Sequence, residues 1–229
     1  DVDRGNPIDV QAYPSENQDR ILIYSGHGGE AIQPYSLVRS AWESDGWKVR
    51  EKEVFPDELQ LFRLIVLVNT GATSAGGETE FTDEQLQSLS AALERGTRIV
   101  VLQEPDSTGS CGSGATNQLI AEWEIPFDYD QLMSVDVPGE AQDFESVATG
   151  QQAMKQVSTL SLKDPCTLGL GGTWLVQGSN STALVSIFQP ANGGDLIFIG
   201  DADVFRNTVA SPDVNDNIVF AQNLAQVVP

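Results

Sequence analysis

The chain has 229 residues and carries 33 Asp and Glu against 12 Lys and Arg, which gives a formal net charge of -21. This acidic balance repels nucleic acid phosphates and anionic lipid head groups, so it excludes nucleic acid as a partner and suits a salty or extracellular setting. No apolar run approaches the roughly 18 residues that a membrane span needs, and we expect no membrane insertion.

The two cysteines, Cys111 and Cys166, both lie in loop-like sequence rich in Gly, Ser, Pro and Thr. Free structural thiols usually lie in apolar surroundings, which neither cysteine has. We therefore predict a disulfide between them. A structural disulfide implies an oxidising compartment, so we expect an extracellular, periplasmic or cell-surface protein.

The start of the chain differs in composition from the rest. Residues 1–19 are polar and include Pro7 and Pro14, which indicates a leader or linker. From residue 20 onward, apolar runs alternate with helical patterns, without an internal repeat or low-complexity tract. We predict a single α/β domain over residues 20–229.

The first half of this domain begins with an apolar run, 20–24, which predicts a buried strand. A helix is expected to follow between Pro34 and Gly46, with its small and aromatic apolar residues on the core side. Residues 47–54 alternate apolar and charged side chains, as in a partly exposed edge strand. The continuous apolar run 63–69 predicts a strand that is covered on both faces, at the centre of the sheet.

The next helix has the clearest boundaries. Thr82 and Gln85 form a capping box at its start, and Gly96 follows its end. Another buried strand is expected over residues 97–102. This alternation of strands and helices predicts a mainly parallel sheet with helices on both faces.

The second half has weaker patterns. From residue 124 to 172 we expect only irregular structure or short strands. Clearer strands follow at 174–177, 183–188 and 195–199, the last two joined as a hairpin, which predicts an antiparallel edge. A final helix is expected from about Val214 or Asp216 and should pack on the sheet.

Two segments near the end of the chain are LIFIGDADVFRN at 196–207 and NIVFAQNL at 217–224. Together with the order of elements, they resemble the class I glutamine amidotransferase-like superfamily, and within it the non-catalytic branches: gliding-motility and ABC-transporter auxiliary proteins and the intraflagellar-transport GIFT domain. The resemblance covers most of residues 20–229. It implies a flavodoxin-like (Rossmann-like) three-layer fold.

The catalytic branch of this superfamily uses a cysteine in a tight elbow after a central strand, and a histidine from a later strand end. Here the elbow after Leu102 offers Gln103, Glu104 and Pro105, and the late strand end offers Asp201. Nucleophile and base must share a hydrogen bond, and neither is at its place. We therefore expect no amidotransferase activity.

The only histidine, His27, gives rise to an alternative. The segment 21–28, ILIYSGHG, resembles the His-Gly loop of caspase-like cysteine peptidases, in which the histidine pairs with a cysteine. Cys111 would be the nucleophile and His27 the base of such a hydrolase. The disulfide interpretation of Cys111 competes with this one, and a count of free thiols distinguishes them.

Polar residues follow several of the predicted parallel strands, whose carboxyl ends form the edge where α/β proteins bind ligands. The candidate ligand-binding residues are His27, Asn69, Glu104, Asp201 and Asp203. The carboxylates and the amide could hold a divalent cation, and a further alternative is a metal-dependent hydrolase that uses His27, Asp201 and Asp203. The competing interpretation is that such residues cap helices and turns.

The glycines after the first strand, Gly26, Gly28 and Gly29, do not have the spacing of a dinucleotide-binding loop, and we expect no cofactor. Together, these observations predict a non-catalytic amidotransferase-like binding module of an exported or cell-surface protein. Its ligand would be a protein, a glycan or a small polar molecule at the carboxyl edge of the strands.

Overall fold

In the computed structural model, the described residues are 19–27, 35–69, 80–105, 111, 114–125, 129–132, 139–148, 150–169, 171–178, 181–190, 193–210 and 216–226. The predicted leader, residues 1–19, lies outside them except for Asp19. Within the described part, no helix combines the length and apolar character needed to cross a bilayer.

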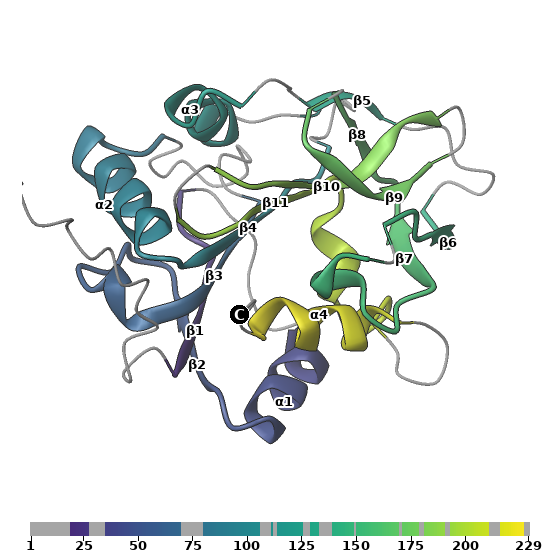
Figure 1. The fold of residues 1–229 in the computed structure, drawn as a ribbon, viewed down its shortest axis with the longest axis horizontal. Helices are drawn as coiled ribbons and strands as arrows, with labels where there is room; N and C mark the ends of the chain where they lie inside the picture. Colours follow the sequence, from purple (N-terminus) through teal and green to yellow (C-terminus); the bar gives the residue numbers. More distant parts are fainter. Residues whose placement is uncertain are drawn as a thin grey trace, which may run out of the picture.

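A nine-stranded sheet forms the centre of the molecule, in the order β2-β1-β3-β4-β11-β10-β8-β5, with β9 also paired to β10 (Figure 1). The first five strands in this order are parallel. They are β2 (Lys48–Lys52), β1 (Arg20–Tyr24), β3 (Phe62–Val68), β4 (Arg98–Leu102) and β11 (Leu196–Ile199). The long apolar runs therefore lie in the parallel half, where both faces are covered.

The remaining strands are antiparallel. In the main sheet they are β10 (Ala183–Phe188), β8 (Cys166–Leu168), β9 (Thr173–Gln177) and β5 (Tyr129–Leu132), and β6 (Ala141–Glu145) pairs with β7 (Thr159–Lys163) in a separate small sheet. The pairing of β10 with β11 confirms the predicted antiparallel part of the sheet.

Helices cover both faces of the sheet (Figure 1). On one face lie α1 (Ser36–Ser44) and α4 (Asn217–Ala225), and on the other α2 (Asp83–Glu94) and α3 (Gly114–Glu122). Three short 3₁₀ turns complete the described elements: η2 (Leu59–Leu61), η3 (Gln152–Met154) and η5 (Ala202–Phe205). The indole Nε1 of Trp42 in α1 donates to the carbonyl of Ala221 in α4 at 2.7 Å, which joins the two helices of one layer.

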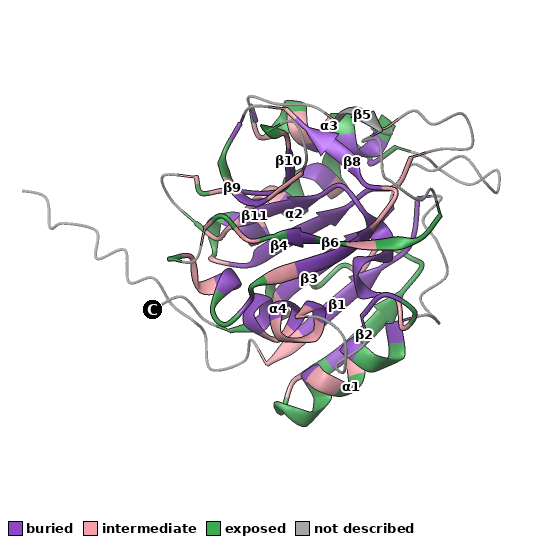
Figure 2. Ribbon diagram, turned by 90° about the vertical axis from the view of Figure 1, so that its right-hand side faces the viewer, coloured by how far each residue is buried: buried purple, intermediate pink, exposed green. Residues whose placement is uncertain are grey.

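The sheet separates two apolar cores. Alternate residues of β3 enter different cores: Leu64 and Val66 pack with α1 and α4, whereas Ile65 and Leu67 pack with α2 and α3. The strands of the parallel half are consequently buried along almost their whole length, apart from edge strand β2 (Figure 2). This is the three-layer, flavodoxin-like α/β fold predicted from the element order.

Helix α3 is the element that the sequence patterns missed, because it falls in a segment taken as the loop through Cys111. Its apolar positions are few, and Leu119 and Ala115 are the buried ones. A hydrogen bond from the Thr116 hydroxyl to Gln103 Oε1, 2.6 Å long, holds it to the end of β4. Tertiary contacts thus stabilise a helix whose own periodicity is weak.

Candidate functional site

The carboxyl ends of four neighbouring parallel strands carry the predicted site residues. His27 follows β1, Asn69 follows β3, Glu104 follows β4 and Asp201 follows β11. The structure divides them into separate groups, because side chains at a sheet edge can turn toward either face.

The first group is a carboxylate cluster, which we define as Glu104, Asp201 and Asp203. Their carboxylate oxygens lie within 4.8 Å of one another. Asp203 belongs to η5, the 3₁₀ turn that directly follows Asp201. The cluster therefore forms because β4 and β11 are adjacent and a tight turn brings Asp203 back over their ends.

Asp201 is the fully buried member of this cluster. Its two carboxylate oxygens accept backbone N–H groups, from Lys163 at 2.6 Å and from Asp203 at 2.7 Å. The second bond caps η5, the role that the capping interpretation predicts. Burial raises the pKa of Asp201 to about 8, and the negative charge of Asp203 adds to this, while the two backbone hydrogen bonds oppose it.

Glu104 has the more strongly raised pKa, about 9. Burial is the largest cause, and the hydrogen bond and negative charge of Asp203 and the charge of Asp201 act in the same direction. The carboxylate cluster therefore favours a state in which one proton is retained between neighbouring carboxylates, as expected where like charges share a buried site.

Two cations partly neutralise the cluster. Arg206 Nε lies 2.5 Å from Asp203 Oδ1, and Arg206 Nη2 lies 4.0 Å from Glu104 Oε1. Lys163 Nζ lies 3.8 Å from Asp203 Oδ2. The exposed fractions of the side chains are 38% for Lys163 and 26% for Arg206, against 18% for Glu104 and 8% for Asp203, so the two cations are more exposed than the carboxylates with which they pair.

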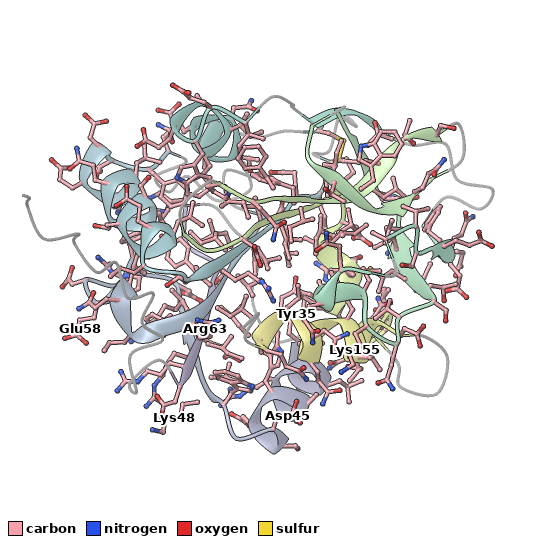
Figure 3. All side chains as sticks on the ribbon, viewed as in Figure 1. Tyr35, Asp45, Lys48, Glu58, Arg63 and Lys155 are labelled. Atoms are coloured by element: carbon pink, nitrogen blue, oxygen red, sulfur yellow. A yellow bond between two sulfur atoms is a disulfide. The ribbon has the colours of Figure 1, made fainter. Side chains whose placement is uncertain are left out.

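Tyr35 packs beside the cluster at the start of α1. Its hydroxyl donates to the carbonyl of Ala202 at 2.8 Å. Burial raises the pKa of Tyr35 well above its ordinary value, and the negative charges of the cluster, Glu104 first, add to the effect. Tyr35, which is labelled in Figure 3, therefore stays a neutral donor that anchors η5.

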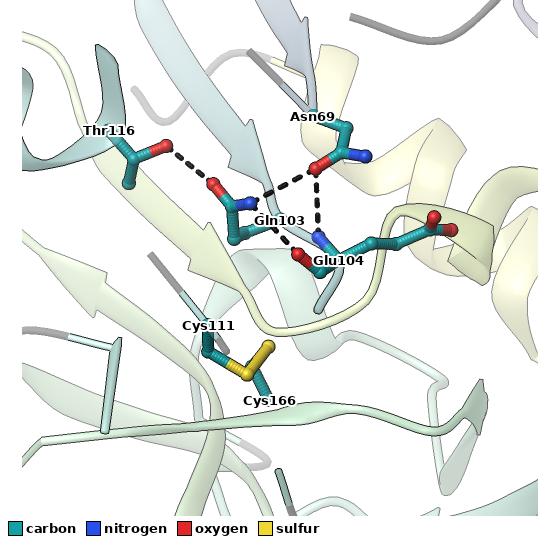
Figure 4. The surroundings of a disulfide bond; sticks show 6 residues. All are labelled: Asn69, Gln103, Glu104, Cys111, Thr116 and Cys166. Atoms are coloured by element: carbon teal, nitrogen blue, oxygen red, sulfur yellow. Dashed lines mark hydrogen bonds between the residues drawn. A yellow bond between two sulfur atoms is a disulfide. The ribbon is translucent and has the colours of Figure 1, made fainter. Parts of the chain in front are cut away.

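Asn69 is buried and joins the ends of β3 and β4 (Figure 4). Its Oδ1 accepts from Gln103 Nε2 at 3.0 Å and from the Glu104 backbone N–H at 3.1 Å. Its φ of 46° lies in the left-handed region, which Asn tolerates better than most residues. Asn69 thus fixes the backbone that carries Glu104, which is a positioning role.

His27 belongs to a different group, on the α2 side of the sheet. Its ring packs at a tilt of 46° against the ring of Phe81, with centroids 4.4 Å apart, and its Nδ1 lies 2.5 Å from the Tyr24 hydroxyl. Its Nε2 lies 3.1 Å from Gln85 Oε1, an oxygen that also accepts the Thr82 N–H. Nε2 therefore donates to Gln85, and Nδ1 shares a hydrogen bond with the Tyr24 hydroxyl.

These contacts bear on the metal-dependent alternative. Among the described residues, one group of side chains is close enough to share a metal ion. It consists of Glu104, Asp201 and Asp203 and does not include His27. The structure thus brings Asp201 and Asp203 together, as predicted, and places His27 elsewhere. A cation at the cluster would have to compete with Arg206 and Lys163.

Cys111 and Cys166 form the predicted disulfide, with their Cα atoms 5.9 Å apart (Figure 4). The interpretation of Cys111 as a nucleophile paired with His27 is wrong, because both sulfurs are bonded to each other and no free cysteine is left. The physical reason is that β8 places Cys166 beside Cys111.

Sequence reasoning missed the cations of the site. Arg206 is three residues after Asp203, and at this spacing a short helical turn brings two side chains together. The spacing could therefore have indicated the ion pair. Lys163 ends β7, in the region for which no definite element was predicted. Nothing in the local sequence indicates that this strand returns to β11.

No protein-family model matches the chain, and no curated protein matches it by sequence. Solved structures share its fold. The mmIFT52 N-terminal domain superposes with a TM-score of 0.63 at 13% identity, over 92% of this chain and 99% of that chain. A ThuA-like protein from Parabacteroides merdae gives 0.52 at 13% identity, over 92% of each chain.

A cold-adapted β-galactosidase from Rahnella sp. R3 gives a TM-score of 0.55 at 13% identity, and the match spans 89% of this chain but 30% of that enzyme. Identities this low show the fold alone. Together, these matches support the flavodoxin-like, three-layer α/β fold.

Proposed function

We propose that the chain is a non-catalytic amidotransferase-like module of an exported or cell-surface protein, and that it binds a polar ligand over the carboxylate cluster. The ligand is a small polar molecule, a glycan or a polar segment of another protein. The observation that carries the proposal is the pair of partly exposed cations, Arg206 and Lys163, held over buried carboxylates at the ligand-binding edge of the fold.

The chemistry of this edge favours binding over catalysis. A hydrolase with a covalent intermediate needs a nucleophile activated by a base. The sulfurs of Cys111 and Cys166 are bonded to each other, and the His27 ring uses both nitrogens in contacts with Tyr24 and Gln85. The resemblance of residues 196–207 and 217–224 to the non-catalytic branches of the superfamily agrees with this assignment.

The disulfide supports an exported protein, because such bonds persist in oxidising compartments. The net charge of -21 is also typical of proteins that remain soluble in salty surroundings.

The test is a binding screen with neutral and acidic oligosaccharides, capped dipeptides and Ca²⁺, read out by thermal shift and confirmed by calorimetry. We expect at least one probe to raise the Tm of the wild-type chain, to lose this effect in Arg206→Gln, and to keep it in the exposed control Lys155→Gln. A probe whose effect is unchanged by both Arg206→Gln and Lys163→Gln would place binding elsewhere. Turnover of a peptide or ester substrate by the wild-type chain would contradict the non-catalytic assignment.

A further inference from the structure

A second surface on this molecule has the opposite charge to the chain as a whole. Strand β2 is the last strand at one side of the main sheet. Its residues Lys48, Arg50 and Lys52 are exposed, whereas Val49 between them is buried in the core that contains α1. Alternate residues of a strand point to opposite faces, so the three cations lie together on the face away from α1. We call these three residues the basic edge.

Most of the positive charge of the basic edge is not neutralised by ion pairs with other described residues. Lys48 pairs with Asp19, and within the described part of the chain no ion pair reaches Arg50 or Lys52. Glu51, the acidic residue between them, points the other way and pairs with Arg39 of α1 at 3.1 Å. The chain has only 12 Lys and Arg, so three on one face of a five-residue strand is a local reversal of its charge.

The backbone of β2 also has an open side. The Lys48 N–H donates to Asp19 and the Lys52 carbonyl accepts from Ser25, both on the β1 side. Backbone groups alternate along a strand, so the N–H and C=O groups of Val49 and Glu51 point outward, away from β1. No strand among the described residues pairs with β2 on that side. This is the arrangement that accepts an added strand.

We propose that β2 binds an extended acidic peptide of another protein, which adds to the sheet as a further strand. Side chains on one face of a strand repeat at about 6.6 to 6.8 Å, and a peptide with Asp or Glu at every second residue has the same repeat. Its acidic groups would lie opposite the basic edge, and its backbone would pair with Val49 and Glu51. A second copy of β2 is disfavoured because it would place cations against cations.

This proposal is independent of binding at the carboxylate cluster, because it uses none of the residues of that cluster. Lys48 lies at the outer margin of the molecule, and Lys155, a control position, lies apart from it (Figure 3). The probe is a short capped peptide of alternating Glu and Thr with a fluorescent label, and its binding is measured by anisotropy at low salt.

Side-chain and backbone recognition are tested by separate variants. The double variant Arg50→Gln/Lys52→Gln should weaken peptide binding about tenfold, by loss of two exposed ion pairs, while Lys155→Gln leaves it unchanged. Glu51→Pro removes an outward N–H and keeps the basic edge, and it should weaken binding about tenfold relative to Glu51→Gln. A urea unfolding curve checks that each variant is folded.

Amide hydrogen exchange of the wild-type chain provides a measurement that does not depend on any variant: the peptide should protect the amides of Val49 and Glu51. The proposal is overturned if a peptide of the same composition with its Glu residues in one block binds equally well, or if these amides are not protected. A third outcome would also overturn it. If Glu51→Pro and Glu51→Gln bind the alternating peptide equally well, and also bind a sulfated polysaccharide equally well, the basic edge binds polyanions in general.

Discussion

Replacement of Glu104 by Gln should change how the stability of the protein depends on pH. Glu104 is mostly buried, beside Asp203 and Asp201, and its pKa is raised from 4.5 to about 9. An acid with a raised pKa holds a proton in the folded state that it loses in the unfolded state. Its neutral form therefore stabilises the fold at low pH, and this stabilisation is lost as the pH rises from 4.5 toward 9.

The size of the effect follows from the number of protons. Between pH 6 and pH 8, the folded chain retains about one proton at Glu104 that the unfolded chain has released, so the free energy of unfolding falls by about 1.4 kcal/mol per pH unit, or roughly 3 kcal/mol over this range. Asp201, with its pKa raised to about 8, contributes in the same direction up to that pH. Gln cannot titrate, so Glu104→Gln removes the first contribution and leaves the second.

The assay is urea unfolding at pH 6, 7 and 8 in the same buffer, with Glu58→Gln as the matched control, because Glu58 is exposed. We expect the slope of unfolding free energy against pH to become less negative by about 1.4 kcal/mol per unit in Glu104→Gln only. Parallel slopes for wild type and Glu104→Gln would refute the reasoning, because they would mean that Glu104 is ionised in the folded protein throughout this range.

Three further predictions concern the scaffold. The double variant Cys111→Ser/Cys166→Ser should lower the free energy of unfolding by about 4 kcal/mol, because the disulfide restricts the unfolded chain over a separation of 55 residues. The assay is urea unfolding without reductant, and an unchanged midpoint would contradict the prediction. Tyr24→Phe should cost about 1 kcal/mol of stability by removing the hydrogen bond to His27, and should leave ligand binding at the carboxylate cluster unaltered. Asn217→Ala should cost about 3 kcal/mol in thermal unfolding, because this fully buried amide bonds backbone groups of β7 and η5 at 2.8 to 2.9 Å; a loss below about 1 kcal/mol would mean that these groups find other partners.

The elements that sequence patterns predicted well are those with strong local signals. The continuous apolar runs of β3 and β4 leave no alternative to a strand covered on both faces, and the predicted capping box of Thr82 and Gln85 is present at the start of α2. Helix α3 and the β6–β7 pair lack such signals. In β6 only Phe144 is buried, so its alternation is too sparse to distinguish a strand from a loop.

The candidate site could be predicted only in part, for a geometric reason. The prediction that the parallel strands end at one edge placed Glu104, Asp201 and Asp203 along it and left open whether they converge, and in the structure these three do lie together. It was not enough for His27, which follows β1 but turns toward Phe81 on the opposite face from Tyr35. The face to which a residue turns after a strand depends on the loop backbone, and the φ of 54° at His27 is not encoded by hydrophobic periodicity.

The same geometry determines where recognition can occur at this edge. Asn69, Gln103 and Asp201 use polar atoms in hydrogen bonds to one another, to the backbone or to Thr116, as expected of buried polar groups. They set the shape of the edge but present little to a ligand. The side chains that combine charge with exposure are Lys163 and Arg206. Because both are cations held in place by carboxylates, a ligand must offer acceptor oxygens at the right spacing, or it must compete with Asp203 for Arg206. In the proposed binding mode, the specificity of this edge therefore depends on the two residues that the sequence patterns did not select, and much less on the acidic residues that they did.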